Sequence, residues 1–593
     1  MFNSALEYLQ GFFGYSSFRE SQEPIIKSLL NSCDTLAIMP TGGGKSICYQ
    51  IPSMCFSGTT IVISPLISLM KDQVDSIIEN GFNAAYINST LPSFEVNKIL
   101  NRLSMGKIKL LYVAPERLLS REFLESVNNT HISQVAVDEA HCISQWGHDF
   151  RPSYKNIKTF IDLLKTRPVV SAFTATATNK VQNDITSLLG MTNPNVFVSG
   201  FNRENLHIKC LKISNKLDYI TEYIKVNRGQ SGIIYASTRK EVNNIYEHLN
   251  SIGIECGRYH AGLLEGERNL MQDEFVHDSK NIIVATNAFG MGIDKSNVRF
   301  VIHYNMPRSI EAYYQEIGRA GRDFLDSECI LLFSPRDISI HKYLIEQSCQ
   351  NDYSKKLESE KLQLMVDYIY TNDCLKKYIL SYFGETTPPS VCSKCSNCTA
   401  EGELVDRTLD AQKVLSCIYR MKREFGVGMI VDVLKGSTNQ KVYDNSFHTL
   451  STYGIMKSSK KKDLTEFINT LISHGYISIN DGQYPTLRLN NQSMMVLRGD
   501  SKVTFKEYTT IKSVSTSEAL FDELRNQRLQ IARENKIPPY LVFSDSTLKS
   551  MIKIMPKDEE SMLKVSGVGE KKLQKYAKRF LEVINSYEDK KNA

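Results

Sequence analysis

The sequence has one tryptophan among 593 residues, against 29 tyrosines and 26 phenylalanines. It also lacks an apolar run long enough to cross a membrane, because the uncharged stretch at residues 47–70 is interrupted by two prolines, a glycine and several serines and threonines. The chain does not open with a basic segment followed by an apolar one, so no secretory signal is predicted. These absences exclude a membrane-spanning protein and predict a cytosolic one with no membrane partner.

The chain has little net charge and an odd number of cysteines. Its 71 lysines and arginines exceed its 65 aspartates and glutamates by 6, an excess that permits binding to a polyanion without requiring it. Thirteen cysteines in a reducing compartment do not indicate a disulfide framework, so clustered cysteines are candidate metal ligands. A chain of this length is too long for one hydrophobic core, and several domains are expected.

Short apolar runs alternate with polar helical stretches over the first 340 residues. TLAIM, TTIVIS, IKLLYVA, QVAVD and VVSAFTA are the strands expected within residues 1–203, and SGIIYA, NIIVAT, RFVIHY and ECILLF are those expected within 204–340. Buried strands that alternate with helices are typical of a parallel sheet covered on both faces. The sequence therefore predicts an α/β multidomain protein that begins with two tandem parallel-sheet domains.

Three smaller units are expected after residue 340, where the alternation ends. They are a helical module at 341–404 with a cysteine cluster, a mixed unit at 405–515 and a basic helical unit at 516–593. In the mixed unit, a helix capped by Asp463 and ended by Gly475 precedes a hairpin expected between Ile477 and Leu489. Linkers are expected near residues 200, 340, 400 and 515.

A glycine-rich turn stands between an expected strand and an expected helix in TLAIMPTGGGKSICYQ. The residues of this predicted phosphate loop are Thr41, Gly42, Gly43, Gly44, Lys45 and Ser46. The glycines let backbone N–H groups converge on phosphate oxygens, Lys45 can reach the β- and γ-phosphates, and Ser46 can hold Mg²⁺. Met39 replaces the first glycine of the strict pattern, and the alternative is a glycine-rich turn with a chance lysine.

Two adjacent carboxylates, Asp138 and Glu139, follow the expected strand VAV. Asp138 at that place can hold Mg²⁺, and Glu139 can orient or deprotonate an attacking water. An acidic pair on a solvated turn is the alternative. In the second domain, Arg319 and Arg322 are three residues apart, so on a helix they share a face and could reach a γ-phosphate. Together these features predict ATP in the cleft between the two domains.

A possible adenine site precedes the phosphate loop in FGYSSFRESQ. Tyr15 and Arg19 could sandwich an adenine, and the Gln22 amide could donate to N7 and accept from the 6-amino group. Taken alone, an aromatic residue and an arginine at helical spacing more often pack on a surface.

The cysteine cluster has the spacing C-x17-C-x2-C-x2-C and consists of Cys374, Cys392, Cys395 and Cys398. Four thiolates suit a tetrahedral structural Zn²⁺ and leave no coordination position open for chemistry. An iron–sulfur cluster is the alternative that the short run of cysteines leaves open.

The motifs together resemble those of one family. They are FGYSSFRESQ, MPTGGGKS, ISPLISLMKDQ, VDEAHCISQWGHDFRPSY, FTATAT, IIYASTR, YHAGL, VATNAFGMGIDK and YYQEIGRAGRD. In this order and spacing they resemble the RecQ family of superfamily 2 DNA helicases, in its compact bacterial form. The resemblance implies two RecA-like domains, a zinc-binding module, a winged-helix domain and an HRDC-like domain.

The resemblance also implies roles for individual residues. The implied catalytic set is Lys45, Asp138, Glu139, Gln315 and Arg322, with Arg319 alongside. The segment SQWGHDFRP would be an aromatic-rich loop that couples DNA binding to ATP hydrolysis, with Trp146 and Phe150 stacked on bases. His148 and Arg151 would contact the DNA backbone or relay to the ATP site. Packing under the loop is the alternative for Phe150.

The implied activity is an ATP-dependent 3′–5′ DNA helicase that acts in recombination, repair, replication-fork maintenance and the SOS response. Its cofactors would be ATP, Mg²⁺ and Zn²⁺, and its partners single-stranded and duplex DNA, with single-strand binding protein and recombination proteins as candidate protein partners. It would be cytoplasmic and act at the nucleoid. A DNA-binding scaffold with a silent ATPase and an RNA helicase are the competing hypotheses.

Two basic surfaces in the last two units are further candidates for DNA contacts. Lys460–Lys462 stand at an expected helix start, where either phosphate binding or an exposed loop edge would explain them. Gly567 and Gly569 could open a helix whose amides meet a phosphate. In that helix Leu573, Tyr576, Phe580 and Ile584 are expected inside, and Lys572, Lys575, Lys578 and Arg579 outside.

Overall fold

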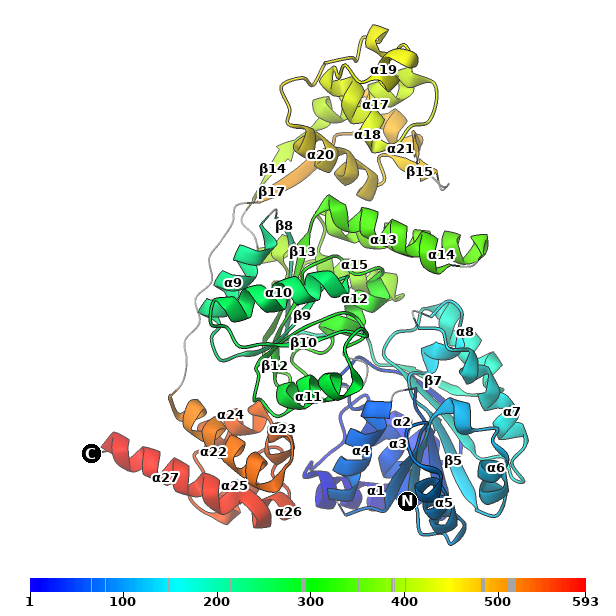
Figure 1. The fold of residues 1–593 in the computed structure, drawn as a ribbon, viewed down its shortest axis with the longest axis vertical. Coiled ribbons are helices and arrows are strands. Elements are labelled where there is room, and N and C mark those ends of the chain that lie inside the picture. The colour runs from blue at the N-terminus through cyan, green and yellow to red at the C-terminus, as the bar shows by residue number, and fades with distance from the viewer. Residues whose placement is uncertain are drawn as a thin grey trace.

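The computed structural model describes residues 1–592 except 66, 80, 148, 214, 290–294, 350, 386, 387, 389, 400, 401, 481–485 and 509–518. Figure 1 shows two α/β domains, a helical layer above the second of them, a yellow unit at the far end and a red helical unit beside both domains. Within the described residues, no helix is both long and apolar enough to cross a membrane.

The first domain is a seven-stranded parallel sheet in the order β3-β4-β2-β5-β6-β1-β7. Its strands are β1 (Thr35–Ile38), β2 (Thr59–Ile63), β3 (Ala84–Ile87), β4 (Leu110–Val113), β5 (Ile132–Val137), β6 (Val169–Thr174) and β7 (Asn195–Val198). All five expected strands are present. The two that sequence reasoning missed, β3 and β7, are the short edge strands, and β7 is largely exposed.

Helices cover both faces of this sheet. They are α1 (Phe2–Tyr8), α2 (Glu23–Leu30), α3 (Lys45–Cys55), α4 (Ile67–Glu79), α5 (Ser93–Ser104), α6 (Arg121–Asn128), α7 (Asn156–Asp162) and α8 (Asn179–Leu188). Helices α2, α3 and α4 share one apolar cluster with the sheet, and α5 to α8 share another.

The second domain has a six-stranded parallel sheet in the order β10-β11-β9-β12-β13-β8. Its strands are β8 (Leu206–Lys212), β9 (Ser231–Tyr235), β10 (Gly257–Tyr259), β11 (Ile282–Ala285), β12 (Val298–His303) and β13 (Ser327–Phe333). Its helices are α9 (Lys216–Val226), α10 (Arg239–Ser251), α11 (Glu265–Val276) and α12 (Ile310–Ile317). The four expected strands are confirmed, and the missed strands β8 and β10 again lie at the edges.

The linker expected near residue 340 is wrong, because helix α13 (Pro335–Ser348) runs unbroken through that position. A capping box at Ser334 and Asp337 fixes its start. It leads to α14 (Asp352–Tyr370), α15 (Leu375–Tyr382) and α16 (Ser396–Thr399). One apolar cluster joins these helices to both parallel-sheet domains, so the cysteine module packs as one body with them.

The next unit has a core of its own and is closed by antiparallel pairing of β14 (Gly402–Asp406) with β17 (Thr504–Tyr508). Between them lie α17 (Thr408–Met421), α18 (Val427–Lys435), α19 (Gln440–Asp444), α20 (Lys461–Ser473) and α21 (Asn491–Arg498). The expected hairpin is present as β15 (Ser478–Asn480) and β16 (Thr486–Arg488), and its tip at 481–485 is outside the described residues.

The helix expected to start after Asp463 begins earlier than predicted. Lys460 is the residue before α20, so Asp463 lies in the first turn and does not cap the helix, although an acidic residue there still suits the helix dipole. Lys461 forms an ion pair of 2.8 Å with Asp432. Gly475, with φ of +75°, follows the end of the helix as predicted.

The last unit is all-helical around a separate apolar cluster. Its helices are α22 (Ala519–Asn535), α23 (Pro539–Val542), α24 (Asp545–Ile554), α25 (Glu559–Leu563), α26 (Glu570–Lys572) and α27 (Lys578–Asn592). Tyr576, Phe580 and Ile584 are buried as predicted. Lys572 is not on the outer face: it is half-buried, burial lowers its pKa to about 8, and its ammonium lies 5.8 Å from the Phe543 ring centroid.

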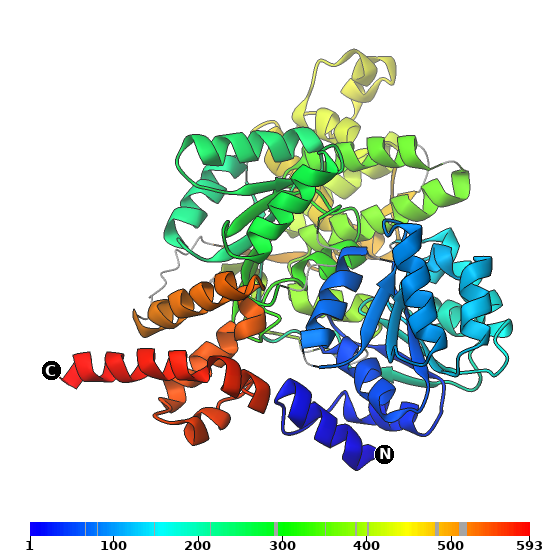
Figure 2. The same cartoon turned by 60° about the horizontal axis from the view of Figure 1, so that its bottom comes forward.

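This last unit contacts both parallel-sheet domains, and Figure 2 shows it beside the N-terminal helices. Gly569 meets Gly14 of the first domain so closely that a Cβ on Gly569 would lie 3.0 Å from the Gly14 Cα. On the second domain, Arg525 donates to the Gly229 carbonyl at 2.9 Å and to Asn281 Oδ1 at 3.2 Å. The expectation that Gly569 opens a free phosphate-binding turn is therefore wrong, because Gly14 covers it.

Candidate ATP and DNA sites

The predicted phosphate loop lies between β1 and α3. Gly42 and Gly44 have φ of +80° and +82°, a backbone conformation that residues with a Cβ rarely adopt. Lys45 is the first residue of α3, and its Nζ donates to the Met39 carbonyl at 3.3 Å. The loop thus presents a helix N-terminus and a lysine together, which is the arrangement that binds phosphate.

The carboxylate pair follows β5, two strands from β1 in the same sheet. The Asp138 amide donates to the Ile63 carbonyl at 2.8 Å, and the Tyr154 hydroxyl donates to the Asp138 carbonyl at 2.9 Å. Glu139 has φ of +46°, a left-handed conformation that costs a residue other than glycine about 1–3 kcal/mol. Both the amide and the carbonyl of Asp138 are therefore hydrogen-bonded, and they fix the backbone from which the Glu139 side chain projects.

The electrostatics of the pair follow from burial. Burial and, after it, the neighbouring Glu139 raise the pKa of Asp138 to about 7 against the opposing effect of Lys45. Burial also lowers the pKa of His141 to about 3, so its imidazole is neutral. His141 Nδ1 lies 2.8 Å from Thr174 Oγ1 and 3.3 Å from Glu139 Oε2.

Arg319 and Arg322 do not share a helix face, and the sequence-based expectation on this point is wrong. Helix α12 ends at Ile317, and Gly321 turns the chain with φ of +57° while its amide donates to the Val298 carbonyl at 2.9 Å. The two glycines at 318 and 321 allow this turn where the helix was expected to continue. Arg319 is buried, and Gln315 is half-buried on α12.

Arg322 lies directly against the phosphate loop of the first domain. A Cβ built on Gly42 would be 3.4 Å from the Arg322 Cα and 3.5 Å from its Cβ. The fold thus brings this arginine of the second domain to the loop of the first, as expected for ATP between two domains.

Arg203, at the junction of the two domains, is the contact that sequence reasoning missed. Its guanidinium donates to the Thr41 carbonyl in the phosphate loop and to the carbonyls of Ala320 at 3.1 Å and Gly321 at 2.7 Å. It is 8% exposed, and burial lowers its pKa. In the sequence, Arg203 is simply an arginine in the linker expected near residue 200. A charged residue in a linker is normally assigned to the surface, so nothing in the pattern indicates this contact.

The residues of the expected adenine site lie beside the phosphate loop. Arg19 Nη1 donates to the Gly42 carbonyl at 2.8 Å, and its guanidinium lies 4.5 Å from the ring centroid of Phe324 in the second domain. Gln22 Nε2 is 3.3 Å from the carbonyls of Gly43 and Gly44. Tyr15 is 40% exposed. In this structure Arg19 and Gln22 therefore contact the loop itself.

The segment SQWGHDFRP at residues 144–152, called the tryptophan loop below, belongs to the first domain and contacts the cysteine module. The Trp146 ring packs edge-to-face on Tyr353 of α14 at 5.8 Å, and the Lys180 ammonium lies over it at 2.7 Å. Arg151 Nη1 donates to the Pro65 carbonyl at 2.9 Å. Phe150 is half-buried, and His148 lies outside the described residues.

The four cysteines expected to bind a metal come together. Their sulfur atoms all lie within 4.8 Å of one another, and Cys374 and Cys395 are 4.0 Å apart. Tetrahedral zinc with Zn–S bonds of about 2.3 Å requires S–S distances of about 3.8 Å, so the cluster fits zinc. The Lys377 amide donates to Cys374 Sγ and the Cys392 amide to Cys398 Sγ, so backbone amides position two of the four sulfur atoms.

Comparisons with known proteins agree with this geometry. Family models match as a DEAD/DEAH box helicase at residues 19–185, a helicase conserved C-terminal domain at 215–323, a RecQ zinc-binding domain at 335–399, an RQC domain at 401–513 and an HRDC domain at 517–584. The ATP-dependent DNA helicase RecQ of Bacillus subtilis (strain 168) is 49% identical over 99% of both chains. The chain belongs to the RecQ family of DNA helicases.

Two other matches are less similar to this chain. The RecQ helicase of Pasteurella multocida (strain Pm70) is 40% identical over 98% of this chain and 94% of its own. A solved structure of Mss116p bound to single-stranded RNA and AMP-PNP is 18% identical, covers 62% of this chain and 81% of its own, and has a TM-score of 0.48.

The family membership settles several expectations. The protein is an ATP-dependent DNA helicase, which goes against the silent scaffold and the RNA helicase. The four cysteines form the zinc site of the RecQ zinc-binding domain, and the iron–sulfur alternative is not supported. The fold is confirmed as two RecA-like domains followed by zinc-binding, winged-helix and HRDC domains.

In the absence of Mg²⁺ and nucleotide, the stability of Asp138→Asn relative to the wild type should increase as the pH rises. An acid whose pKa is raised on folding, here to about 7, binds extra protons in the folded state, so its contribution to stability falls as the pH rises from about 4 to about 7. The thermal midpoint of Asp138→Asn minus that of the wild type should therefore grow between about pH 5 and about pH 8. Asp162→Asn, at an exposed ion pair of α7, is the control and should show no such trend. A constant difference for Asp138→Asn would contradict the assignment of a costly buried charge.

Proposed function

We propose that the helicase hydrolyses Mg-ATP between its two RecA-like domains and moves 3′ to 5′ along one DNA strand. The observation that carries the proposed hydrolysis is the position of Arg322, which the second domain places against Gly42 of the phosphate loop, while the polarity rests on the resemblance to the family. A guanidinium at that place meets the γ-phosphate only when the domains are together, so closure and hydrolysis are coupled.

Glu139 is proposed to orient and deprotonate the attacking water. Its carboxylate projects from a strained turn, 3.3 Å from the neutral imidazole of His141. His141 lies beside this carboxylate and is itself positioned by a 2.8 Å contact between its Nδ1 and Thr174 Oγ1 of the FTATAT segment. Lys45 would neutralise charge on the β- and γ-phosphates, and Gln315 and Arg319 would complete the proposed catalytic set with Arg322.

Ser46 and Asp138 fit a magnesium ion. Both are oxygen donors beside the phosphate loop, and the raised pKa of Asp138 marks a buried carboxyl that a cation would favour in its charged form. A bound Mg²⁺ would supply charge neutralisation for the phosphates.

The tryptophan loop is proposed to report DNA binding to the ATP site. Trp146 would leave Tyr353 and Lys180 to stack on a base, with Phe150 beside it. The same loop is hydrogen-bonded to the segment that carries Glu139, since the Arg151 amide donates to the carbonyl of Cys142, three residues after Glu139, at 2.9 Å. Movement of the ring would therefore reach Glu139 and His141 through a few covalent and hydrogen bonds.

The biological role that fits is unwinding of duplex DNA during recombination, repair and replication-fork maintenance, in the cytoplasm. This rests on the RecQ names of relatives that match the whole chain. Single-strand binding protein and recombination proteins are the protein partners consistent with that role.

Glu139→Gln should reduce ATP hydrolysis by about 10²–10⁴-fold because the variant lacks the base, while ATP and DNA binding persist. Steady-state ATPase and nucleotide-binding assays measure both quantities. Glu116→Gln, at an exposed glutamate of the same domain, should turn over like the wild type. Unchanged turnover in Glu139→Gln would refute the proposed chemistry.

Trp146→Ala should bind single-stranded DNA with a loss of at most about 1–3 kcal/mol yet lose most of the stimulation of ATPase by DNA. Tyr353→Ala is the matched control, because it removes the same ring contact without altering the loop. If Tyr353→Ala loses stimulation equally, the tryptophan acts through packing on α14 and not through a base.

A further inference from the structure

The linker between the two RecA-like domains, residues 199–205 between β7 and β8, lies against α15 of the zinc-binding domain. Lys376 Nζ donates to the Arg203 carbonyl at 2.8 Å, and Lys376 is 6% exposed. A buried ammonium is costly unless it is hydrogen-bonded, so this contact ties α15 to the linker. Arg203 is therefore held at two points: its carbonyl by the zinc-binding domain, and its guanidinium by the phosphate loop and the turn before Arg322.

A second contact holds the linker two residues earlier, at Phe201. The Phe201 amide donates to Glu385 Oε1 at 2.6 Å, and the Phe201 ring stacks on Phe383 with the centroids 4.6 Å apart. Helix α15 ends just before these two partners, where Gly384 has φ of +92° and the Glu385 amide donates to the Leu380 carbonyl at 3.0 Å. The end of α15 thus directs an aromatic ring and a carboxylate to one linker residue.

The same end of α15 also contacts α12, the helix that leads to Arg319 and Arg322. The Phe383 ring centroid lies 5.0 Å from that of Tyr314, and the Tyr314 hydroxyl donates to the Phe201 carbonyl at 2.8 Å. All three aromatic residues are buried, so the linker, α12 and α15 meet in one aromatic cluster. A change in the position of α15 would therefore move both the linker and α12.

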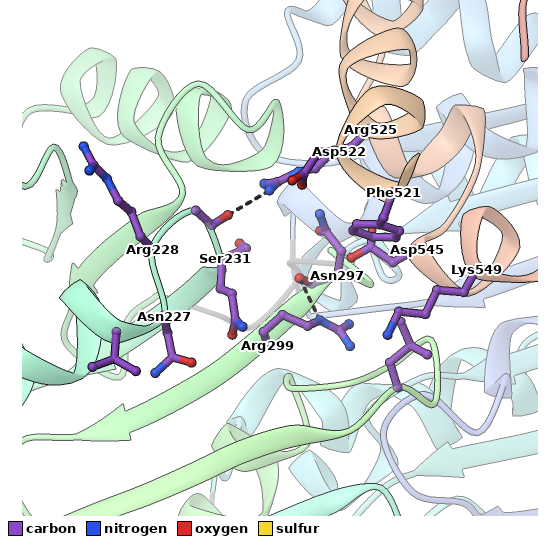
Figure 3. A pocket seen from close by; sticks show the side chains of 14 residues that line it. Asn227, Arg228, Ser231, Asn297, Arg299, Phe521, Asp522, Arg525, Asp545 and Lys549 are labelled. Atoms are coloured by element: carbon purple, nitrogen blue, oxygen red, sulfur yellow. Dashed lines mark hydrogen bonds between the residues drawn. The ribbon is translucent and has the colours of Figure 1, made fainter. Parts of the chain in front are cut away.

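The HRDC domain contacts the second RecA-like domain at other residues. Arg525 donates to the Gly229 carbonyl at 2.9 Å, beside the cavity that Figure 3 shows between the two domains. None of the described residues that line this cavity belongs to the linker or to α12. Arg525 is therefore a matched comparison for Lys376, because each hydrogen-bonds a backbone carbonyl from a flanking domain.

We propose that Lys376, Phe383 and Glu385 are positioning residues for ATP hydrolysis, a role that rests on the one proposed above for Arg322. They hold the linker so that Arg203 bonds the phosphate loop and the turn before Arg322 at the same time. They act by hydrogen bonds and packing on the linker, not by contact with ATP. Because a misplacement of about 1 Å can cost about 10²-fold in rate, their loss should slow hydrolysis while ATP binding persists.

Single-turnover hydrolysis by the full chain, in excess over ATP and with saturating single-stranded DNA, tests the proposal together with the affinity for ATP. Lys376→Met keeps the aliphatic stem and removes the donor, so hydrolysis should fall about tenfold or more while the affinity stays within about twofold. Lys376→Arg restores a donor and should recover most of the rate. A residue that only stabilised the fold would lower the thermal midpoint in Lys376→Met and leave the rate of the folded protein unchanged.

Glu385 provides a second pair of variants at the opposite end of α15 from the zinc ligand Cys374. Glu385→Ala should slow hydrolysis as Lys376→Met does, whereas Glu385→Gln keeps an oxygen that accepts from the Phe201 amide and should retain most of the rate. Zinc content is measured for every variant, and if Lys376→Met loses zinc, the Glu385 pair decides the outcome. Arg525→Met is the control and should hydrolyse ATP like the wild type.

A double-mutant cycle with Arg322→Lys separates this proposal from the proposed function. If Lys376 acts by placing Arg322, Lys376→Met should slow Arg322→Lys further by about twofold or less, because the positioned group has already been changed. The proposal is overturned if Lys376→Met and Glu385→Ala hydrolyse ATP like Arg525→Met, or if the losses from Lys376→Met and Arg322→Lys multiply. Wild-type hydrolysis by Arg322→Lys would instead overturn the proposed function on which it rests.

Discussion

The arrangement of the two RecA-like domains depends on one buried guanidinium. Arg203 donates at once to the phosphate loop of the first domain and to the turn that carries Arg322 in the second. Because a buried cation without partners is costly, the three carbonyls and the guanidinium hold one another in a single geometry. In this arrangement of the domains, these hydrogen bonds act together with the apolar cluster that joins the domains to set the distance between the phosphate loop and Arg322.

Glycines lie at three close contacts between domains, two of which are at the phosphate loop. Gly42 leaves room for Arg322, Gly318 faces Thr41 within 3.0 Å of where its Cβ would stand, and Gly14 meets Gly569. Each glycine removes a side chain at a contact between domains, which allows backbones to touch and carbonyls to be reached. Glu139 shows the opposite situation. Its carboxylate is needed, so a residue with a Cβ adopts a left-handed backbone conformation in spite of the unfavourable free energy.

The sequence was informative where a local pattern determines the structure. The central strands of both sheets, the phosphate loop, the acidic pair and the zinc cysteines follow from apolar runs and short spacings, and all are found where expected. Edge strands such as β7 were missed because an exposed strand has no continuous apolar run. The end of α12 was missed because Arg319 and Arg322 fit a helix equally well, and only the contact with Val298 turns the chain at Gly321. Arg203 and the docking of Gly569 depend on segments far apart in the chain, which periodicity cannot relate.

Single-turnover ATP hydrolysis and ATP affinity in Arg322→Lys would show whether the second domain supplies the arginine that acts on ATP. Lysine keeps the charge but loses the planar fork of donors, so binding should change little while hydrolysis falls by about 10³-fold or more. Hydrolysis at the wild-type rate with intact binding would show that the second domain does not contribute this residue to the reaction, and the proposed coupling of domain closure to chemistry would be wrong.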